Sequence, residues 1–206
     1  MSIQSDVRIL VNYVNSLHDF RLVRPEVPYH HIGATITDAM LQSGVRYETV
    51  VKPRVTKISR YTEAEASTGF LKLLERVGER KLLDWSDTEK PRRVLKVTRF
   101  FVEEHIETEE DLKNWLKNEA NIVKLKKLRG IGDKTADYFK NLVGISTSAV
   151  DRHLIKFLNQ ANINVKIDEY VKAREIINRA AETLKIDKSI FDHSIWKYMS
   201  CKKYRT

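Results

Sequence analysis

Residues 125–136 read Leu-Lys-Lys-Leu-Arg-Gly-Ile-Gly-Asp-Lys-Thr-Ala, and the turn inside this stretch decides the local fold. We expect a short helix, roughly 122–128, to run into Gly130-Ile131-Gly132, and a second helix to start near Asp133. Two glycines around one apolar residue let the chain reverse tightly, while Ile131 anchors the turn in the core. The N–H groups of such a turn, at the positive end of the second helix, can bind phosphate without any side chain. The pattern predicts a helix-hairpin-helix, which grips a DNA backbone without reading its sequence.

The hydrophobic spacing of the rest of the chain is helical almost everywhere. One apolar stripe at helical intervals consists of Val7, Leu10, Val11, Val14 and Leu17. Thr62 followed by Glu65 predicts a capping box at one helix start. Thr108, followed by three acidic residues, predicts the start of another helix. We expect an all-α fold of about nine or ten helices with little or no sheet.

Composition and charge narrow the class of protein. The chain has 206 residues, 42% of them hydrophobic and 32% charged, as in globular proteins. Its 37 Lys and Arg against 28 Asp and Glu give a net charge of +9, which suits a polyanionic partner, nucleic acid before an anionic membrane. The single cysteine, Cys201, excludes an intramolecular disulfide and indicates an intracellular compartment. We expect no membrane span and no secretory signal, since no apolar run is long enough and the first residues lack the required pattern.

Charge is unevenly distributed along the chain. Segment 103–111 holds six acidic residues and no Lys or Arg, and we expect it to form a solvated face. Segment 124–140 holds six Lys and Arg against two Asp, and it coincides with the hairpin. The second segment is therefore the candidate DNA-facing surface.

The informative pattern extends beyond the hairpin. Residues 128–136 are followed, seventeen positions after Lys134, by Asp151 in the stretch Ala-Val-Asp-Arg-His-Leu at 149–154. The two stretches together resemble the helix-hairpin-helix (HhH-GPD) DNA glycosylase superfamily, the endonuclease III-like base-excision enzymes. That family has Leu-Pro-Gly-Val-Gly-x-Lys-Thr-Ala followed by Val-Asp-x-His. Here Arg129 replaces the usual proline, and the intervening segment is about one residue short by comparison with that pattern.

The resemblance implies roles for individual residues. Lys134 would be the nucleophile of a bifunctional glycosylase and AP lyase, and Asp151 the catalytic carboxylate. Gln42, in a stretch similar to the family's Leu-Ser-x-Gln helix end, would fill the gap left by a flipped base. The DNA backbone would be bound by Gly130, Ile131, Gly132, Arg129 and Thr135. The resemblance also implies a monovalent cation at the hairpin, held by carbonyls and a DNA phosphate; we expect no other metal and no cofactor.

The resemblance further implies a two-lobed fold with the active site in a cleft between the lobes. Residues 32–145 would form a central helical barrel that ends in the hairpin, and residues 1–31 with 146–206 the second lobe. Segment 191–196 is similar to the stretch that precedes the iron–sulfur ligands in cluster-bearing members, but one cysteine cannot hold the cluster. We therefore expect a cluster-free, monomeric member that acts on double-stranded DNA with a damaged or mismatched base. The lesion itself stays open.

The two key residues also make chemical sense without the resemblance. Breaking a glycosidic bond develops positive charge on the sugar, so a carboxylate is needed beside it, and strand cleavage needs an amine that forms a Schiff base. The helix dipole and nearby cations disfavour the protonated form of Lys134, while Asp151 reads as a helix N-cap. Three alternatives stay open: a monofunctional glycosylase, a non-catalytic DNA-binding adaptor, and a metal-dependent nuclease that uses the 103–111 acids.

Overall fold

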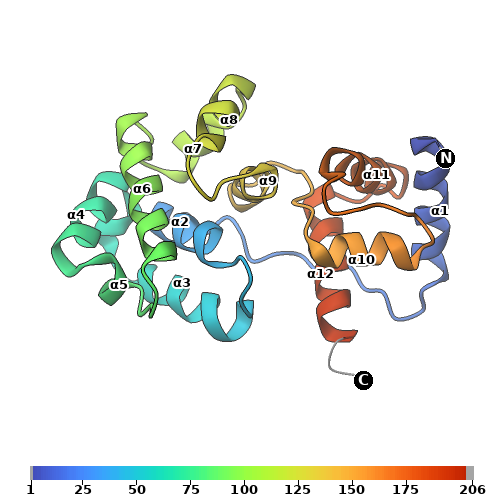
Figure 1. Ribbon diagram of the computed structural model, residues 1–206, viewed down its shortest axis with the longest axis horizontal. Helices are drawn as coiled ribbons and strands as arrows, with labels where there is room; N and C mark the ends of the chain where they lie inside the picture. Colours follow the sequence, from blue (N-terminus) through green and yellow to red (C-terminus); the bar gives the residue numbers. More distant parts are fainter. Residues whose placement is uncertain (1, 203–206) are drawn as a thin grey trace. The chain divides into compact units, whose positions relative to one another are not determined.

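The computed structural model describes the backbone of residues 2–202 and the side chains of residues 2–200, so the Cys201 side chain lies outside it. All the regular secondary structure within that range consists of helices, which confirms the all-α prediction (Figure 1). The α-helices are α1 (Ile3–Ser16), α2 (Ile32–Leu41), α3 (Lys52–Ile58), α4 (Ser67–Val77), α5 (Glu79–Leu82), α6 (Glu89–Glu103), α7 (Glu109–Trp115), α8 (Glu119–Lys126), α9 (Asp133–Leu142), α10 (Arg152–Gln160), α11 (Tyr170–Thr183) and α12 (Lys188–Lys202). A π-helix, η1 (Tyr47–Val51), and a 3-10 helix, η2 (Thr62–Glu65), complete the set. Among the described residues, no helix is long and apolar enough to cross a membrane.

The structure corrects two sequence-based expectations about helices. Its described part has twelve α-helices rather than nine or ten, because pieces as short as the four residues of α5 carry no recognisable apolar stripe. The capping box expected at Thr62 does not form: residues 62–65 are the 3-10 helix η2, and the next α-helix begins only at Ser67. The box expected at Thr108 is present, with Thr108 and Asp111 bonding to each other's backbone N–H groups.

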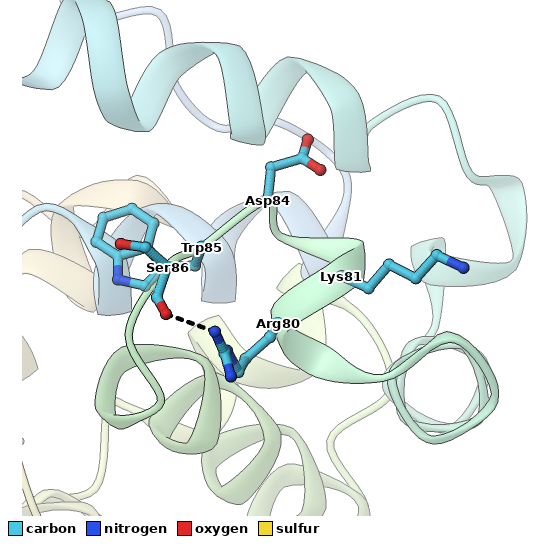
Figure 2. A pocket seen from close by; sticks show the side chains of 5 residues that line it. All are labelled: Arg80, Lys81, Asp84, Trp85 and Ser86. Atoms are coloured by element: carbon cyan, nitrogen blue, oxygen red, sulfur yellow. Dashed lines mark hydrogen bonds between the residues drawn. The ribbon is translucent and has the colours of Figure 1, made fainter.

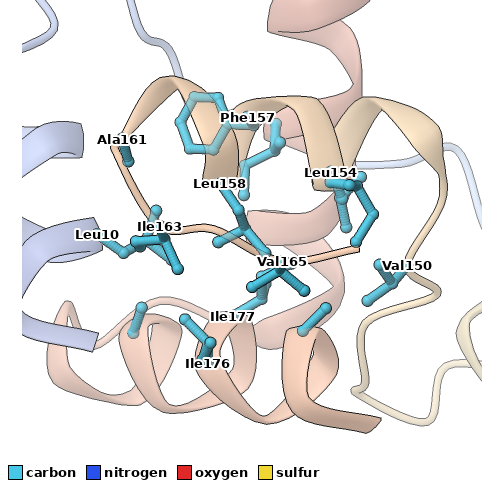
Figure 3. Close-up of a cluster of buried hydrophobic side chains, with 14 of the residues drawn as sticks. Leu10, Val150, Leu154, Phe157, Leu158, Ala161, Ile163, Val165, Ile176 and Ile177 are labelled. Carbon is cyan, nitrogen blue, oxygen red and sulfur yellow. The ribbon is translucent and has the colours of Figure 1, made fainter. Parts of the chain in front are cut away.

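The chain forms two compact units, and the first consists of residues up to Glu26 together with those from Ile145 onward. It contains α1 and α10–α12, in which α11 packs against α1, and α12 against α10 and α11. Their shared core consists of buried apolar side chains, and Figure 3 shows part of it around Leu158 and Ile177. Phe157 and Phe191 are its largest completely buried side chains.

The second unit, Val27–Gly144, is built around α2. Every residue of α2 is buried, because α3, α4, α6, α9 and both η helices pack on it from different sides. The hairpin helices α8 and α9 belong to this unit and contact each other. Helix α9 thus carries Lys134 on an element that packs directly on the central helix.

Candidate active site and nucleic-acid interface

The turn between α8 and α9 has the geometry expected of a helix-hairpin-helix. Ile131 is 4% exposed, and its N–H donates to the carbonyl of Leu128 at 3.1 Å, which closes the turn. Gly130 has φ = +93°, a conformation that side-chain-bearing residues rarely adopt. A Cβ at this position would also lie 2.7 Å from Nη1 of Arg93. Glycine is therefore favoured here by the backbone conformation, and a larger residue would also force the Arg93 side chain to move.

Gly132 has a different role from Gly130. It is the N-cap of α9 with φ = −106°, which any residue can adopt, and nothing lies within 4 Å of the place where a Cβ would be. Its N–H donates to no atom of the described residues, and the first-turn N–H groups of an α-helix have no intrahelical partner. The N–H of Gly132 is thus an open donor at the hairpin, whereas the N–H of Ile131 is used inside the turn.

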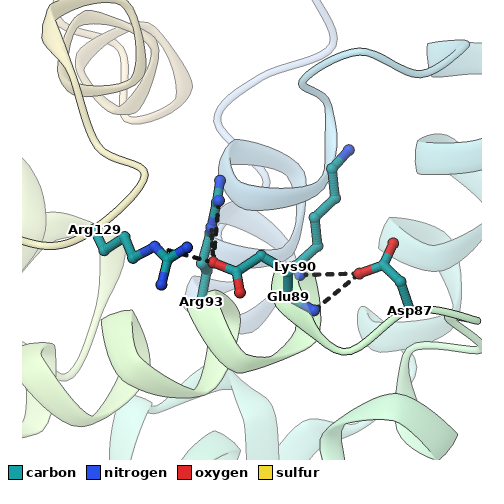
Figure 4. A network of polar contacts seen from close by, with 5 residues as sticks. All are labelled: Asp87, Glu89, Lys90, Arg93 and Arg129. Carbon is teal, nitrogen blue, oxygen red and sulfur yellow. Dashed lines mark hydrogen bonds and ion pairs between the residues drawn. The ribbon is translucent and has the colours of Figure 1, made fainter.

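The charges around the hairpin are partly paired. Oε1 of Glu89, at the start of α6, lies 3.2 Å from Nη2 of Arg93 and 3.4 Å from Nε of Arg129 (Figure 4). Asp87 caps the same helix end by accepting from the N–H of Glu89 at 2.9 Å. The Arg129 side chain is still 77% exposed, so its remaining donors face solvent. Because Glu89 pairs with Arg129, the basic segment 124–140 is locally less positive than its composition indicates.

Two of the sequence-predicted site residues meet in this unit. Nζ of Lys134 donates to Oε1 of Gln42 at 2.7 Å, although 92 positions separate them in the chain. Gln42 is the C-cap of α2, and its Nε2 is enclosed without a hydrogen-bond partner. Nζ of Lys134 also lies 5.2 Å from the ring centroid of Tyr138, one turn further along α9. Thr135 is partly buried in the first turn of the same helix.

A buried carboxylate next to Lys134 was missed by the sequence reasoning. Asp38, on α2, is 0% exposed and accepts hydrogen bonds from three phenols. Its Oδ2 lies 2.7 Å from Oη of Tyr29 and 3.3 Å from Oη of Tyr47, and both of its oxygens lie 3.2 Å from Oη of Tyr138. The signal was present in the sequence, because Asp38 is the one charged residue in an otherwise uncharged ten-residue helix. We call these four residues the Asp38 cluster.

Burial governs the titration of the Asp38 cluster. Loss of solvent raises the pKa of Asp38 to about 6, although the three phenol hydrogen bonds and the charge of Lys134 oppose the rise. Burial, followed by the carboxylate of Asp38, raises the pKa of Tyr29, Tyr47 and Tyr138. The phenols therefore stay protonated as donors, and the carboxyl group titrates within the range of ordinary buffers.

A second lysine, Lys90 on α6, lies in the same region. Its Nζ donates to the carbonyl of Leu41 at 2.7 Å and to that of Ser43, so it caps the end of α2 beside Gln42. Burial lowers the pKa of Lys90, and the nearby charges of Arg93 and Lys134 lower it further, while Asp87 opposes them. Lys90 was also absent from the sequence-based list of candidates, because its position depends on the long-range packing of α6 on α2.

Asp151 lies in the first unit and is the N-cap of α10, as its sequence pattern predicts. Its Oδ1 accepts from the N–H groups of His153 and Leu154 at 2.7 and 3.1 Å, and its Oδ2 lies 3.0 Å from Nδ1 of His153. The ring of Trp196 packs against His153 and stacks on His193. The carboxylate is 23% exposed and held rigidly by these contacts.

Only part of the acidic segment 103–111 forms the solvated face that its composition predicts, because Glu103, Glu110 and Asp111 are exposed while its other acidic residues are wholly or partly buried. Glu109 is buried, and it accepts from the His30 N–H at 2.7 Å and from the Thr35 hydroxyl. Glu107 accepts from the N–H of Thr68 at 2.9 Å. These carboxylates satisfy backbone donors of other segments. Among the described residues, no group of three or more His, Cys, Asp or Glu is placed to hold a metal ion.

A shallow hollow of about 510 Å³ opens elsewhere in the second unit (Figure 2). It is lined by Arg80, Lys81, Asp84, Trp85 and Ser86, with Nη2 of Arg80 donating to the carbonyl of Ser86 at 2.6 Å. None of the sequence-predicted site residues lines it. The hollow is therefore a surface feature separate from the Lys134 site.

Comparison with known proteins gives one match. Residues 8–200 match a family described as a domain of unknown function, DUF8548. No curated protein and no solved structure matches the chain. The match covers nearly the whole chain, so this protein belongs to the DUF8548 family.

Proposed function

We propose that this chain is a DNA base-excision glycosylase with AP lyase activity, and that its two units are the lobes of the HhH-GPD fold that its sequence resembles. The contact between Lys134 and Gln42 carries the proposal. The resemblance assigns both residues to one reaction. Nζ of Lys134 and Oε1 of Gln42 lie 2.7 Å apart, although 92 positions separate the two residues in the chain. A hairpin that only binds DNA does not need this contact.

In the proposed reaction the open N–H of Gly132, at the N-terminus of α9, binds a phosphate of duplex DNA, and exposed Arg129 adds charge. A damaged or mismatched base is flipped out, and Gln42 takes its place in the stack. Ile131 contributes by anchoring the turn rather than by its N–H, which is already bonded.

The chemistry then uses one amine and one carboxylate. The neutral amine of Lys134 attacks C1′, the C1′–N bond breaks, and the base leaves after taking up a proton. Asp151 stabilises the cationic sugar and assists proton transfer. Opening of the sugar ring gives a protonated Schiff base between Lys134 and C1′. Loss of a 2′ proton then expels the 3′ phosphate by β-elimination, and water releases the enzyme.

Borohydride trapping on a duplex with one abasic site tests this proposal. Borohydride reduces the Schiff base to a stable amine, so wild type should give a covalent adduct in the presence of EDTA. Lys134→Gln should give none, while Lys72→Gln, which removes an exposed lysine on α4 outside segment 124–140, should give as much as wild type. Absence of an adduct from folded wild type would leave a monofunctional glycosylase or a DNA-binding adaptor. Strand cleavage abolished by EDTA would instead indicate a metal-dependent nuclease.

A further inference from the structure

The complete burial of the Asp38 carboxylate needs an explanation. Burial of a carboxylate is unfavourable unless donors replace the lost water, and an apolar residue at this position of α2 would avoid the problem. Instead, Tyr29 from the segment before α2, Tyr47 from η1 and Tyr138 from α9 all direct their hydroxyls at it. Three aromatic donors from three segments make a prepared binding site for one negative charge.

Tyr138 connects this negative charge to Lys134. The two residues are one turn apart on α9, so the ring of Tyr138 lies 5.2 Å from Nζ of Lys134 while its hydroxyl donates to Asp38. A phenol that donates to a carboxylate is polarised toward phenolate, which makes its ring a better partner for a cation. The charge of Asp38 therefore acts on Lys134 both directly and through an aromatic ring.

Helix α2 supplies the second contact of the amine as well. Gln42 follows Asp38 by one turn, and its N–H donates to the Asp38 carbonyl at 3.3 Å. Its Oε1 accepts from Lys134. The buried end of α2 thus holds the amine by an amide oxygen and, through Tyr138, by a carboxylate.

The other charges around this site come from several elements. From α6, Lys90 places a like charge near Lys134, while Asp87 and Arg93 act on Lys90 itself. Glu48 acts on Tyr47 in η1, and Glu109 of α7 binds Thr35 one turn earlier on α2. Against the like charge of Lys90, Asp38 is an acid whose attraction to Lys134 favours the protonated amine.

We propose that Asp38 is the positioning residue for the Lys134 amine, and that, acting through Tyr138, it fixes where the amine lies and how readily it releases its proton. The inference rests on the proposed function, because positioning the amine matters for catalysis only if Lys134 is a nucleophile, which must be held in place and must lose a proton before it attacks. The coupling itself needs no DNA to be measured.

The test is an NMR titration of the intact protein after reductive dimethylation of its lysines with ¹³C-formaldehyde. The Lys134 signal is the one that disappears in Lys134→Arg. In Asp38→Asn its titration midpoint should move to lower pH by about half a unit or more, because an opposite charge nearby favours the protonated amine. Tyr138→Phe keeps the ring but loses the hydroxyl, and it should move the midpoint in the same direction by less. The control Asp84→Asn should move the signal of Lys57, its ion-pair partner, and leave that of Lys134 in place.

An unchanged Lys134 midpoint in folded Asp38→Asn would overturn the inference. If Asp38→Asn does not fold, Tyr138→Phe decides by the same criterion. The result is separable from the proposed function, because trapping can fail while the midpoint still moves, and trapping can succeed while it does not.

Discussion

Replacement of Gly132 by alanine separates DNA binding from folding at the hairpin. The backbone at Gly132 has φ = −106° and ψ = −169°, and an added methyl group would meet no atom within 4 Å. Alanine is a poorer N-cap than glycine by up to about 1 kcal/mol, but it also restricts the unfolded chain by a similar amount. The free energy of unfolding should therefore change by less than about 1 kcal/mol.

The same methyl group would stand beside the open N–H that we propose to bind phosphate. Loss of one hydrogen bond to a charged group corresponds to about 1.5–3 kcal/mol, or roughly 10- to 150-fold weaker binding. Because backbone N–H groups read phosphate and not bases, the loss should be equal on duplexes of unrelated sequence.

Fluorescence anisotropy with two undamaged duplexes of different sequence measures this loss at one fixed salt concentration. The matched control is Gly78→Ala, which makes the same change at an open turn between α4 and α5 where φ is +85°. That variant is strained and should lose stability but not DNA affinity. Wild-type affinity in Gly132→Ala, or a loss on only one of the duplexes, would refute the role of the hairpin donor.

Three further outcomes are expected. Gly130→Ala should lower the free energy of unfolding by about 1–3 kcal/mol in urea denaturation, because φ is +93° and Arg93 must move; an unchanged stability would show that the turn relaxes freely. Asp151→Asn should slow base excision by about two orders of magnitude or more on any lesion that wild type accepts, and a wild-type rate would remove the carboxylate from the reaction. The folded pKa of Asp38 is about 6 against 3.8 unfolded, so the folded state binds the proton more tightly and this group's contribution to stability falls as pH rises from 4 to 7. The difference in unfolding free energy between wild type and Asp38→Asn should fall by up to about 3 kcal/mol over that range, and a difference that rises would contradict the burial argument.

Sequence patterns predicted the structure correctly where it depends on residues that are close together in the chain. The hairpin turn, the Thr108 box and the Asp151 cap each depend on residues within a few positions of one another. The start of α4 does not. Its first N–H groups bond to the carbonyl and the carboxylate of Glu107, forty residues further along the chain, so the local Thr62 signal was misleading.

The Asp38 cluster escaped prediction for the same physical reason. Tyr138 lies 100 positions from Asp38, and no spacing rule joins a tyrosine on α9 to a carboxylate on α2. A charged residue inside an otherwise uncharged helix is nevertheless a visible signal that partners must exist. The sequence thus pointed to Lys134 as the proposed nucleophile, whereas only the packing of α9 on α2 reveals which side chains contact it.

The most direct test of the central claim is to locate the trapped amine. Borohydride-trapped protein is digested, and the peptide that carries the sugar remnant is sequenced by mass spectrometry. We predict that the remnant lies on Lys134. Lys90 is the informative competitor, because burial lowers its pKa and it caps the same end of α2. A remnant on Lys90, or one spread over many surface lysines, would contradict the assignment of Lys134 as the nucleophile.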